Sequence, residues 1–231
     1  MHNYRLKTRI IVGKKSNNDP VGLFIEDLPH LFISWSEKNE FDKFFQDLLQ
    51  QLFEPLNAGL IEIAICGSFS VLSENGEAPL YNHIKALLLK DEERNHSGTR
   101  LGFLTKLRKE LLKRRKKREN SGNDSIAYSK HLIIFVDDLV NLVITRNKNT
   151  GLYFLELIRN GPKENIHFIM GSTRSYRGLV QQMIQYEKKG QPSILDNYLP
   201  ELVISPEGLF FYKRPEELNY TRLFSIHEGE N

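Results

Sequence analysis

The chain has 231 residues, a length that suits one α/β domain or at most two small ones. Hydrophobic residues make up 40% of it, which excludes a disordered chain, and no apolar run is long enough for a membrane-spanning helix. The N-terminus lacks the apolar stretch of a signal peptide. The single cysteine, Cys66, excludes an internal disulfide and a cysteine-based zinc site, and the seven histidines never stand at metal-binding spacing.

The net charge of +3 hides a strong asymmetry. Residues 106–118, KLRKELLKRRKKR, contain nine basic residues and one acidic residue, a local charge of +8. The rest of the chain has 23 basic and 28 acidic residues, a charge of −5. The sequence therefore predicts one basic segment on a mildly acidic body.

Hydrophobic periodicity predicts alternating strands and helices in the first half of the chain. A helix is indicated where Phe41, Phe44, Phe45, Leu48 and Leu49 recur at steps of three and four. The predicted elements are a strand (7–12), a polar turn (13–22), a strand (31–35), a helix (41–53), a buried strand (60–67), a loop (73–79) and a helix (79–90).

The second half continues the alternation and then becomes all strand. Its predicted elements are a helix (100–118), a surface loop (121–125), a strand (131–136), a helix (151–160), a strand (166–171), an amphipathic helix (179–184) and strands at 201–205, 208–213 and 221–226, the first two joined by a turn at 206–208. Strands alternating with helices predict an α/β fold whose mostly parallel sheet has helices on both faces. Ligands of such sheets bind beyond the carboxyl ends of the strands.

An acidic pair closes one buried strand. The segment LIIFVDDL, 132–139, has the form of a Walker B strand, in which Asp137 would hold Mg²⁺ through water and Asp138 would orient the attacking water. Any buried strand that ends in aspartate gives the same pattern. The motif alone therefore does not distinguish a Walker B strand from an ordinary buried strand.

The order of segments around this pair resembles the FtsK/SpoIIIE family of RecA-like motor ATPases over about residues 7–190. Pro29-His30-Leu31 resembles the start of that family's first core strand, and 165–175, NIHFIMGSTRS, resembles its sensor strand with Thr173-Arg174 in place of the usual Gln-Arg. Residues 11–21 resemble the small strand pair before the P-loop. The resemblance implies a RecA-like P-loop NTPase fold with three layers, α/β/α, and a C-terminal β-hairpin.

The departure from the family falls at the P-loop, G-x-x-x-x-G-K-[ST]. The aligned residues are 35–42, with Trp35 at the first glycine, Glu40 at the second, Phe41 at the lysine and Asp42 at the hydroxyl position. Two carboxylates stand where a triphosphate would lie, and the nearest alternative, Gly13-Lys14-Lys15-Ser16, lacks the upstream glycine. Although Asp137, Asp138 and Arg174 remain, we expect a pseudo-ATPase domain with weak or absent ATP and Mg²⁺ binding and no metal site.

Degenerate domains of this kind are known in the EssC/EccC coupling ATPases of type VII secretion, and the chain is similar to their third and last domain. Residues 207–226 resemble the final hairpin of those domains. The resemblance implies one domain, 1–231, excised from a longer membrane-anchored chain and lying at the cytoplasmic face of the bacterial membrane. It implies a domain that recognises export substrates such as WXG100-type proteins and regulates the preceding ATPase domains, within a possible hexamer.

The implied mode of recognition is a substrate helix in an apolar groove. Apolar and aromatic residues after the sensor strand are the candidates for its lining: Leu179, Met183, Ile184, Leu195, Tyr198 and Leu199.

Two other functions stay open. One is a residual ATPase completed by a neighbouring subunit, which would use Asp137, Asp138 and Arg174. The other is a nucleic-acid-binding module of an FtsK-like translocase, which would use residues 106–118, although no base-reading motif accompanies them. The basic segment could equally contact anionic lipid or an acidic protein, or be a solvated helix face.

Overall fold

The structure is a computed structural model, and it describes residues 9–25, 30–52, 60–67, 84–88, 97–121, 130–143, 148–173, 201–205, 210–213, 219 and 221–223. Predictions that concern the loops at 73–79 and 122–125, the turn at 206–208 and the helix at 179–184 lie outside these residues. No helix in the described ranges is long and apolar enough to span a bilayer.

An eight-stranded sheet forms the centre of the molecule, in the order β10-β9-β8-β3-β7-β6-β4-β5. Its six strands from β8 to β5 run parallel, while β9 and β10 are antiparallel and form the predicted C-terminal hairpin. The strands are β3 (His30–Trp35), β4 (Ile61–Cys66), β5 (Ile84–Leu88), β6 (His131–Val136), β7 (Ile166–Ser172), β8 (Glu201–Ile204), β9 (Phe210–Lys213) and β10 (Thr221–Leu223).

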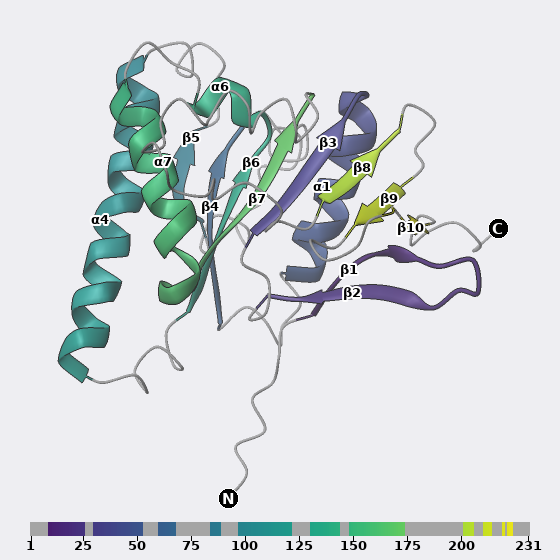
Figure 1. The fold of residues 1–231 in the computed structure, drawn as a ribbon, viewed down its shortest axis with the longest axis horizontal. Coiled ribbons are helices and arrows are strands. Elements are labelled where there is room, and N and C mark those ends of the chain that lie inside the picture. The colour runs from purple at the N-terminus through teal and green to yellow at the C-terminus, as the bar shows by residue number, and fades with distance from the viewer. Residues whose placement is uncertain are drawn as a thin grey trace, which may run out of the picture.

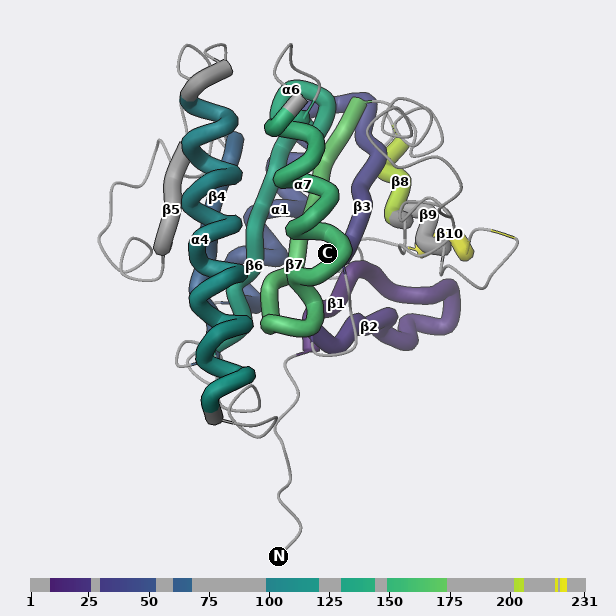
Figure 2. Tube along the Cα trace, turned by 60° about the vertical axis from the view of Figure 1, so that its left-hand side comes forward, coloured from purple at the N-terminus to yellow at the C-terminus, as the bar shows by residue number. Residues whose placement is uncertain are grey.

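Helices cover both faces of this sheet and make three layers, as predicted (Figure 1). Helix α1 (Lys38–Leu52) packs on one face, and α4 (Ser97–Ser121), α6 (Leu139–Val143) and α7 (Lys148–Asn160) lie on the other (Figure 2). Alternate residues of β3, β4, β6 and β7 enter opposite cores, so that Ile133 packs with α1 while Ile134 packs with α4 and α7. This separation follows from the two-residue period of a strand.

A separate two-stranded hairpin precedes the sheet. Strands β1 (Arg9–Lys14) and β2 (Pro20–Phe24) pair antiparallel, and the side chain of Gln51 in α1 hydrogen-bonds both backbone groups of Ile11, at 2.6 and 3.1 Å. The strand pair implied by the family resemblance is therefore present. The turn predicted over 13–22 is confirmed at 15–19 and is wrong at both ends, because Gly13 and Lys14 belong to β1 and residues 20–22 belong to β2.

Two further elements differ from the sequence predictions. The helix predicted near 79–90 is wrong over 84–88, where β5 pairs in parallel with β4 at the sheet edge. Its leucine, lysine and alanine favour a helix locally, and the open edge of β4 overrides that preference. Helix α6 was not predicted, since its five residues are too short to show a helical period.

His30 is a structural residue that joins β3, β7 and α7. Its Nδ1 accepts the backbone N–H of Phe168 at 3.0 Å, so its proton lies on Nε2, which donates to the carbonyl of Ile158 at 2.9 Å. Burial lowers the pKa of His30 to about 3 and keeps the ring neutral. His167, on the next strand, hydrogen-bonds His131 at 3.0 Å between ring nitrogens. These contacts give His30 and His167 structural roles.

Candidate functional site

The carboxyl end of β3 is joined to α1 by two residues only, Ser36 and Glu37. Trp35 is the last residue of β3 and Lys38 is the first of α1. The backbone N–H of Phe41 donates to the carbonyl of Glu37 at 3.2 Å and closes the first helical turn. The chain therefore passes from strand to helix without a wide loop at this edge of the sheet.

Two aromatic rings occupy the space above this connection. The indole of Trp35 stacks on the ring of Phe41, with centroids 5.2 Å apart and planes 17° from parallel. The indole N–H donates to the backbone carbonyl of Asp137 at 3.2 Å, which ties the end of β3 to the end of β6. Gly171 in β7 has no side chain here, and a Cβ at this position would lie 2.7 Å from Phe41 Cζ.

A lysine and an acid of α1 complete the cluster. The ammonium of Lys38 lies 5.6 Å from the ring centre of Trp35 and 5.0 Å from that of Phe41, and its Nζ is 2.6 Å from a carboxylate oxygen of Asp42. Glu40 pairs in turn with Lys43 at 2.7 Å. Both acids predicted at this site are therefore paired with lysines of their own helix.

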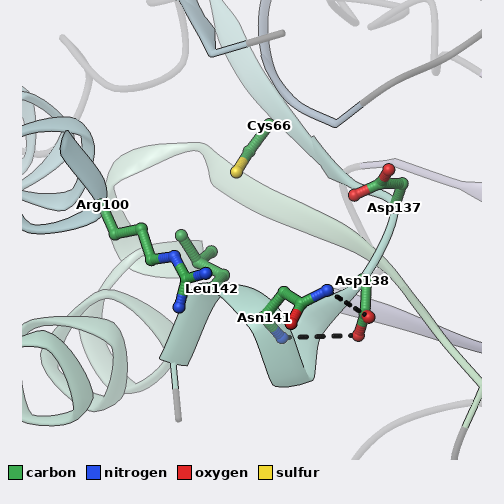
Figure 3. Close-up of a pocket in the computed structure, with 6 residues that line it drawn as sticks. All are labelled: Cys66, Arg100, Asp137, Asp138, Asn141 and Leu142. Carbon is green, nitrogen blue, oxygen red and sulfur yellow. Dashed lines mark hydrogen bonds between the residues drawn. The ribbon is translucent and has the colours of Figure 1, made fainter. Parts of the chain in front are cut away.

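The two aspartates that follow β6 lie in different environments. Asp137 is buried, whereas Asp138 accepts the backbone N–H of Val140 at 3.0 Å and the side-chain amide of Asn141 at 2.8 Å. Asp138 thus caps the start of α6. Figure 3 shows Asp138 directed at Asn141, with the carboxylate of Asp137 apart from both.

Beside the acidic pair lies a small pocket (Figure 3). Six side chains from β4, α4, α6 and the link between β6 and α6 line it: Cys66, Arg100, Asp137, Asp138, Asn141 and Leu142. Within the described residues no three histidine, cysteine or acidic side chains come close enough to hold a metal ion. The pocket therefore offers polar groups of both charges in a narrow space.

The structure brings Trp35, Phe41, Asp42 and Asp137 together at one edge of the sheet. Arg174 lies outside the described residues, as do all the candidates for a substrate groove: Leu179, Met183, Ile184, Leu195, Tyr198 and Leu199.

Sequence reasoning missed two residues of this cluster, Lys38 and Gly171. The spacing of Lys38 to Asp42 is the i,i+4 spacing of a helical ion pair, a signal that could have identified Lys38. Gly171 carried no signal, because its close neighbour Phe41 is remote in the sequence.

Several solved structures of ATPases share this arrangement of elements. The cytoplasmic domain of the type VII secretion ATPase EccC from Thermomonospora curvata superposes with a TM-score of 0.68 at 16% identity, over 96% of this chain and 26% of that one. The chain has the fold of these secretion ATPase domains. EssC from Geobacillus thermodenitrificans (ATPases 2 and 3) gives a TM-score of 0.63 at 10% identity, over 97% of this chain and 42% of that one.

A third structure, of T. curvata EccC ATPases 2 and 3, is a complex with a signal sequence peptide. It gives a TM-score of 0.69 at 14% identity, over 95% of this chain and 40% of that one. The chain therefore spans less than half of each of these three proteins. No protein-family model and no curated protein matches the sequence.

The RecA-like fold allows the connection between β3 and α1 to be compared with the P-loop of an ATPase. In P-loop ATPases the glycine-rich loop after the first core strand wraps phosphate with its backbone N–H groups, and its lysine and hydroxyl reach the β- and γ-phosphates and Mg²⁺. Here β3 is that strand, and α1 already begins at Lys38, within the eight aligned residues. The backbone that would form the wrapping loop is therefore helical from Lys38 onward.

Proposed function

We propose that this chain is a non-catalytic domain of a type VII secretion motor, which recognises export substrates and regulates neighbouring ATPase domains. A single observation carries the non-catalytic part. Where an active domain has a loop that wraps phosphate, this chain has a two-residue connection flanked by Trp35 and Phe41, whose rings stack on each other.

The chemistry of the filled site supports this proposal. The ammonium of Lys38, the first residue of α1, is paired with Asp42 and lies over both rings. A triphosphate would have to displace the rings, break this pair and approach the carboxylate of Asp42. Each of these steps raises the free energy of the nucleotide complex, so we expect no ordered Mg-ATP against residues 35–42.

Calorimetric titration of the 231-residue chain with Mg-ATP tests the proposal. Trp35 is the single tryptophan, so its fluorescence reports directly on the site in the same samples. We expect no heat of binding and no change in emission at concentrations that saturate an active P-loop domain. Binding at micromolar concentration, with a fluorescence change that is lost in Trp35→Phe, would overturn the inert-site proposal.

The recognition part of the proposal is supported by the likeness to an EccC structure that holds a signal sequence peptide. We propose that WXG100-type proteins are the partners and that a groove lined by Leu179, Met183, Ile184, Leu195, Tyr198 and Leu199 receives a helix of the substrate. Titration with secreted helical-hairpin proteins tests this. Met183→Asp combined with Ile184→Asp should abolish binding, whereas the exposed Leu152→Asp should bind as the unmodified chain does. Equal affinity for both variants would contradict the groove assignment.

The regulatory part concerns the chain in its larger context. We propose that residues 1–231 form one domain of a longer, membrane-anchored protein at the cytoplasmic face, with hexameric assembly of the full protein. The short span of the chain on its structural neighbours supports such a context. Substrate binding would then bias how this domain packs on the ATPase domain beside it. Turnover by the multi-domain protein, measured with and without a substrate protein, should change only when the groove residues are intact.

A second candidate is a residual ATPase completed by a neighbouring subunit. It is favoured by the acidic pair Asp137 and Asp138, which stands at the end of β6 as a Walker B pair would. Against it, the carboxylate of Asp138 is engaged in capping α6. Measurable turnover that disappears in Asp138→Asn would favour this candidate, and absence of turnover in the assembled protein would exclude it.

A further inference from the structure

Arginines and lysines lie on different sides of α4 in its basic segment, residues 106–118. Three of its four arginines pair with acids: Arg108 with Glu156, Arg114 with Glu62 and Glu110, and Arg118 with Glu164. The fourth, Arg115, is half-buried on the same side of the helix. Arg114 also donates to the carbonyls of Lys130, Glu164 and Asn165. These contacts fasten α4 to the strands and turns beneath it.

The lysines of the same segment lie on the opposite side of the helix. All five are exposed, and none forms an ion pair with any residue in the described ranges: Lys106, Lys109, Lys113, Lys116 and Lys117. At 3.6 residues per turn they fall within an arc of about 100° and extend over roughly 16 Å along the axis. We call these five residues the lysine stripe.

The stripe occupies an outer position in the molecule. Helix α4 is the longest helix described, with 25 residues, and it stands along one side of the sheet with its outer face uncovered by any described element (Figures 1 and 2). Leu112 lies beside the stripe and is 40% exposed. One side of α4 thus presents a row of cations with an apolar side chain next to it.

We propose that the lysine stripe binds the surface of an anionic lipid membrane. Five lysines on one narrow arc can reach a flat surface together, and each lysine near such a surface contributes to binding. The chain outside residues 106–118 carries a charge of −5, so an anionic surface attracts the side that bears the stripe more than the rest of the protein. Leu112 can enter the headgroup layer as the lysines contact phosphate.

Other anionic partners fit this surface less well. A duplex is a narrow cylinder, and a straight stripe that crosses it meets only a few phosphates at a time. Arginine binds phosphate with two parallel hydrogen bonds, but Arg108, Arg114 and Arg118 are already paired with carboxylates of the protein. The exposed charges are flexible lysines without a fixed geometry, which suits a fluid surface of mobile headgroups.

Vesicle co-sedimentation of the 231-residue chain tests the proposal. We expect binding to vesicles that contain phosphatidylglycerol, weaker binding at high salt, and none to pure phosphatidylcholine. The variant with Lys113→Gln, Lys116→Gln and Lys117→Gln should bind about 100-fold more weakly. A matched variant with Lys15→Gln, Lys43→Gln and Lys163→Gln removes the same charge elsewhere and should lose much less affinity.

Three outcomes would overturn the proposal: no binding to anionic vesicles, equal loss in the two triple variants, or displacement from vesicles by a DNA duplex at equal phosphate concentration. Circular dichroism and thermal unfolding of both variants check that they fold, so a loss of binding can be assigned to the stripe. The lysine stripe shares no residue with the cluster around Trp35 and Phe41, so this test is independent of the proposed function.

Discussion

Gly171 is the residue on which the cluster at the end of β3 depends most closely. A Cβ there would lie 2.5 Å from the backbone oxygen of Asp137 and 2.7 Å from Phe41 Cζ, and backbone cannot move aside as a flexible side chain can. We predict that Gly171→Ala lowers the free energy of unfolding by about 2 kcal/mol or more.

Gly102, an exposed glycine within α4, is the matched control. Nothing lies within 4 Å of a Cβ at this position. Gly102→Ala should therefore raise the free energy of unfolding by about 0.5–1 kcal/mol through helix propensity. Urea unfolding of both variants checks the pair, and a loss in both would show that crowding at Gly171 is not the cause.

His30 makes a pH-dependent contribution with a defined sign. Its pKa is about 3 in the folded protein and near 6.5 when unfolded, so the unfolded chain binds more protons between these values. The stabilisation by the neutral ring is complete above pH 6.5 and is lost as the pH falls toward 3.

We predict that His30→Phe lowers the free energy of unfolding at pH 7 by about 2–4 kcal/mol, because the N–H of Phe168 and the carbonyl of Ile158 lose their partner. The difference in free energy of unfolding between this variant and the unmodified protein should decrease below pH 6.5, by up to about 1.4 kcal/mol per pH unit. Urea unfolding at pH 7 and pH 5 measures it, and a gap that stays constant would contradict the assignment of a neutral ring.

For single residues, the sequence indicates which types stand at the site but not which contacts they make. Trp35, Phe41 and Asp42 could be selected because they replace the glycine, lysine and hydroxyl of a P-loop. The bond of Trp35 to Asp137 could not be predicted, because these residues are about 100 positions apart and meet only through the order of the strands. The stack of Trp35 on Phe41 is local in the sequence, but it depends on where α1 begins and on the space left by Gly171.

Helix α4 depends on a buried ion pair at its C-terminal half. Arg118 is 2.7 Å from Glu164, whose side chain is 1% exposed. Burial raises the pKa of Glu164, and the positive charges of Arg118, Arg115 and Arg114 oppose that shift, so loss of Arg118 makes the charged carboxylate less favourable. The pair therefore stabilises the attachment of α4 only while both charges are present.

We predict that Arg118→Met lowers the free energy of unfolding by about 3 kcal/mol at pH 8, because it leaves Glu164 charged and unpaired. The loss should shrink toward pH 5, since the carboxylate is protonated as the pH falls through its raised pKa. The double variant Arg118→Met, Glu164→Gln should recover much of the stability at pH 8. Urea unfolding at both pH values checks this, and a loss that is independent of pH would contradict it.

Most elements could be predicted from periodicity, and the failures have physical causes. The buried strands β3, β4, β6 and β7 are apolar runs too short for helices, so their type was clear from the sequence. Strand β5 was predicted as a helix because its residues favour one locally, while the hydrogen-bonding edge of β4 decides its conformation.

For the whole molecule, the charge asymmetry was visible in the sequence but its sorting was not. Composition gives +8 for residues 106–118 and −5 for the remainder. Which cations face inward depends on where Glu62, Glu156 and Glu164 lie after folding. The lysine stripe is therefore a property of the tertiary structure.

The order of the strands has a consequence for synthesis on the ribosome. Strand β3 emerges early, yet its neighbour β8 is about 170 residues later in the chain, with Phe32 opposite Glu201. Until then one hydrogen-bonding edge of β3 has no strand beside it, and such edges attract other nascent chains. A chain stopped after residue 200 should therefore aggregate or occupy a chaperone, and adding residues 201–231 as a separate peptide should restore solubility, as light scattering during refolding would measure.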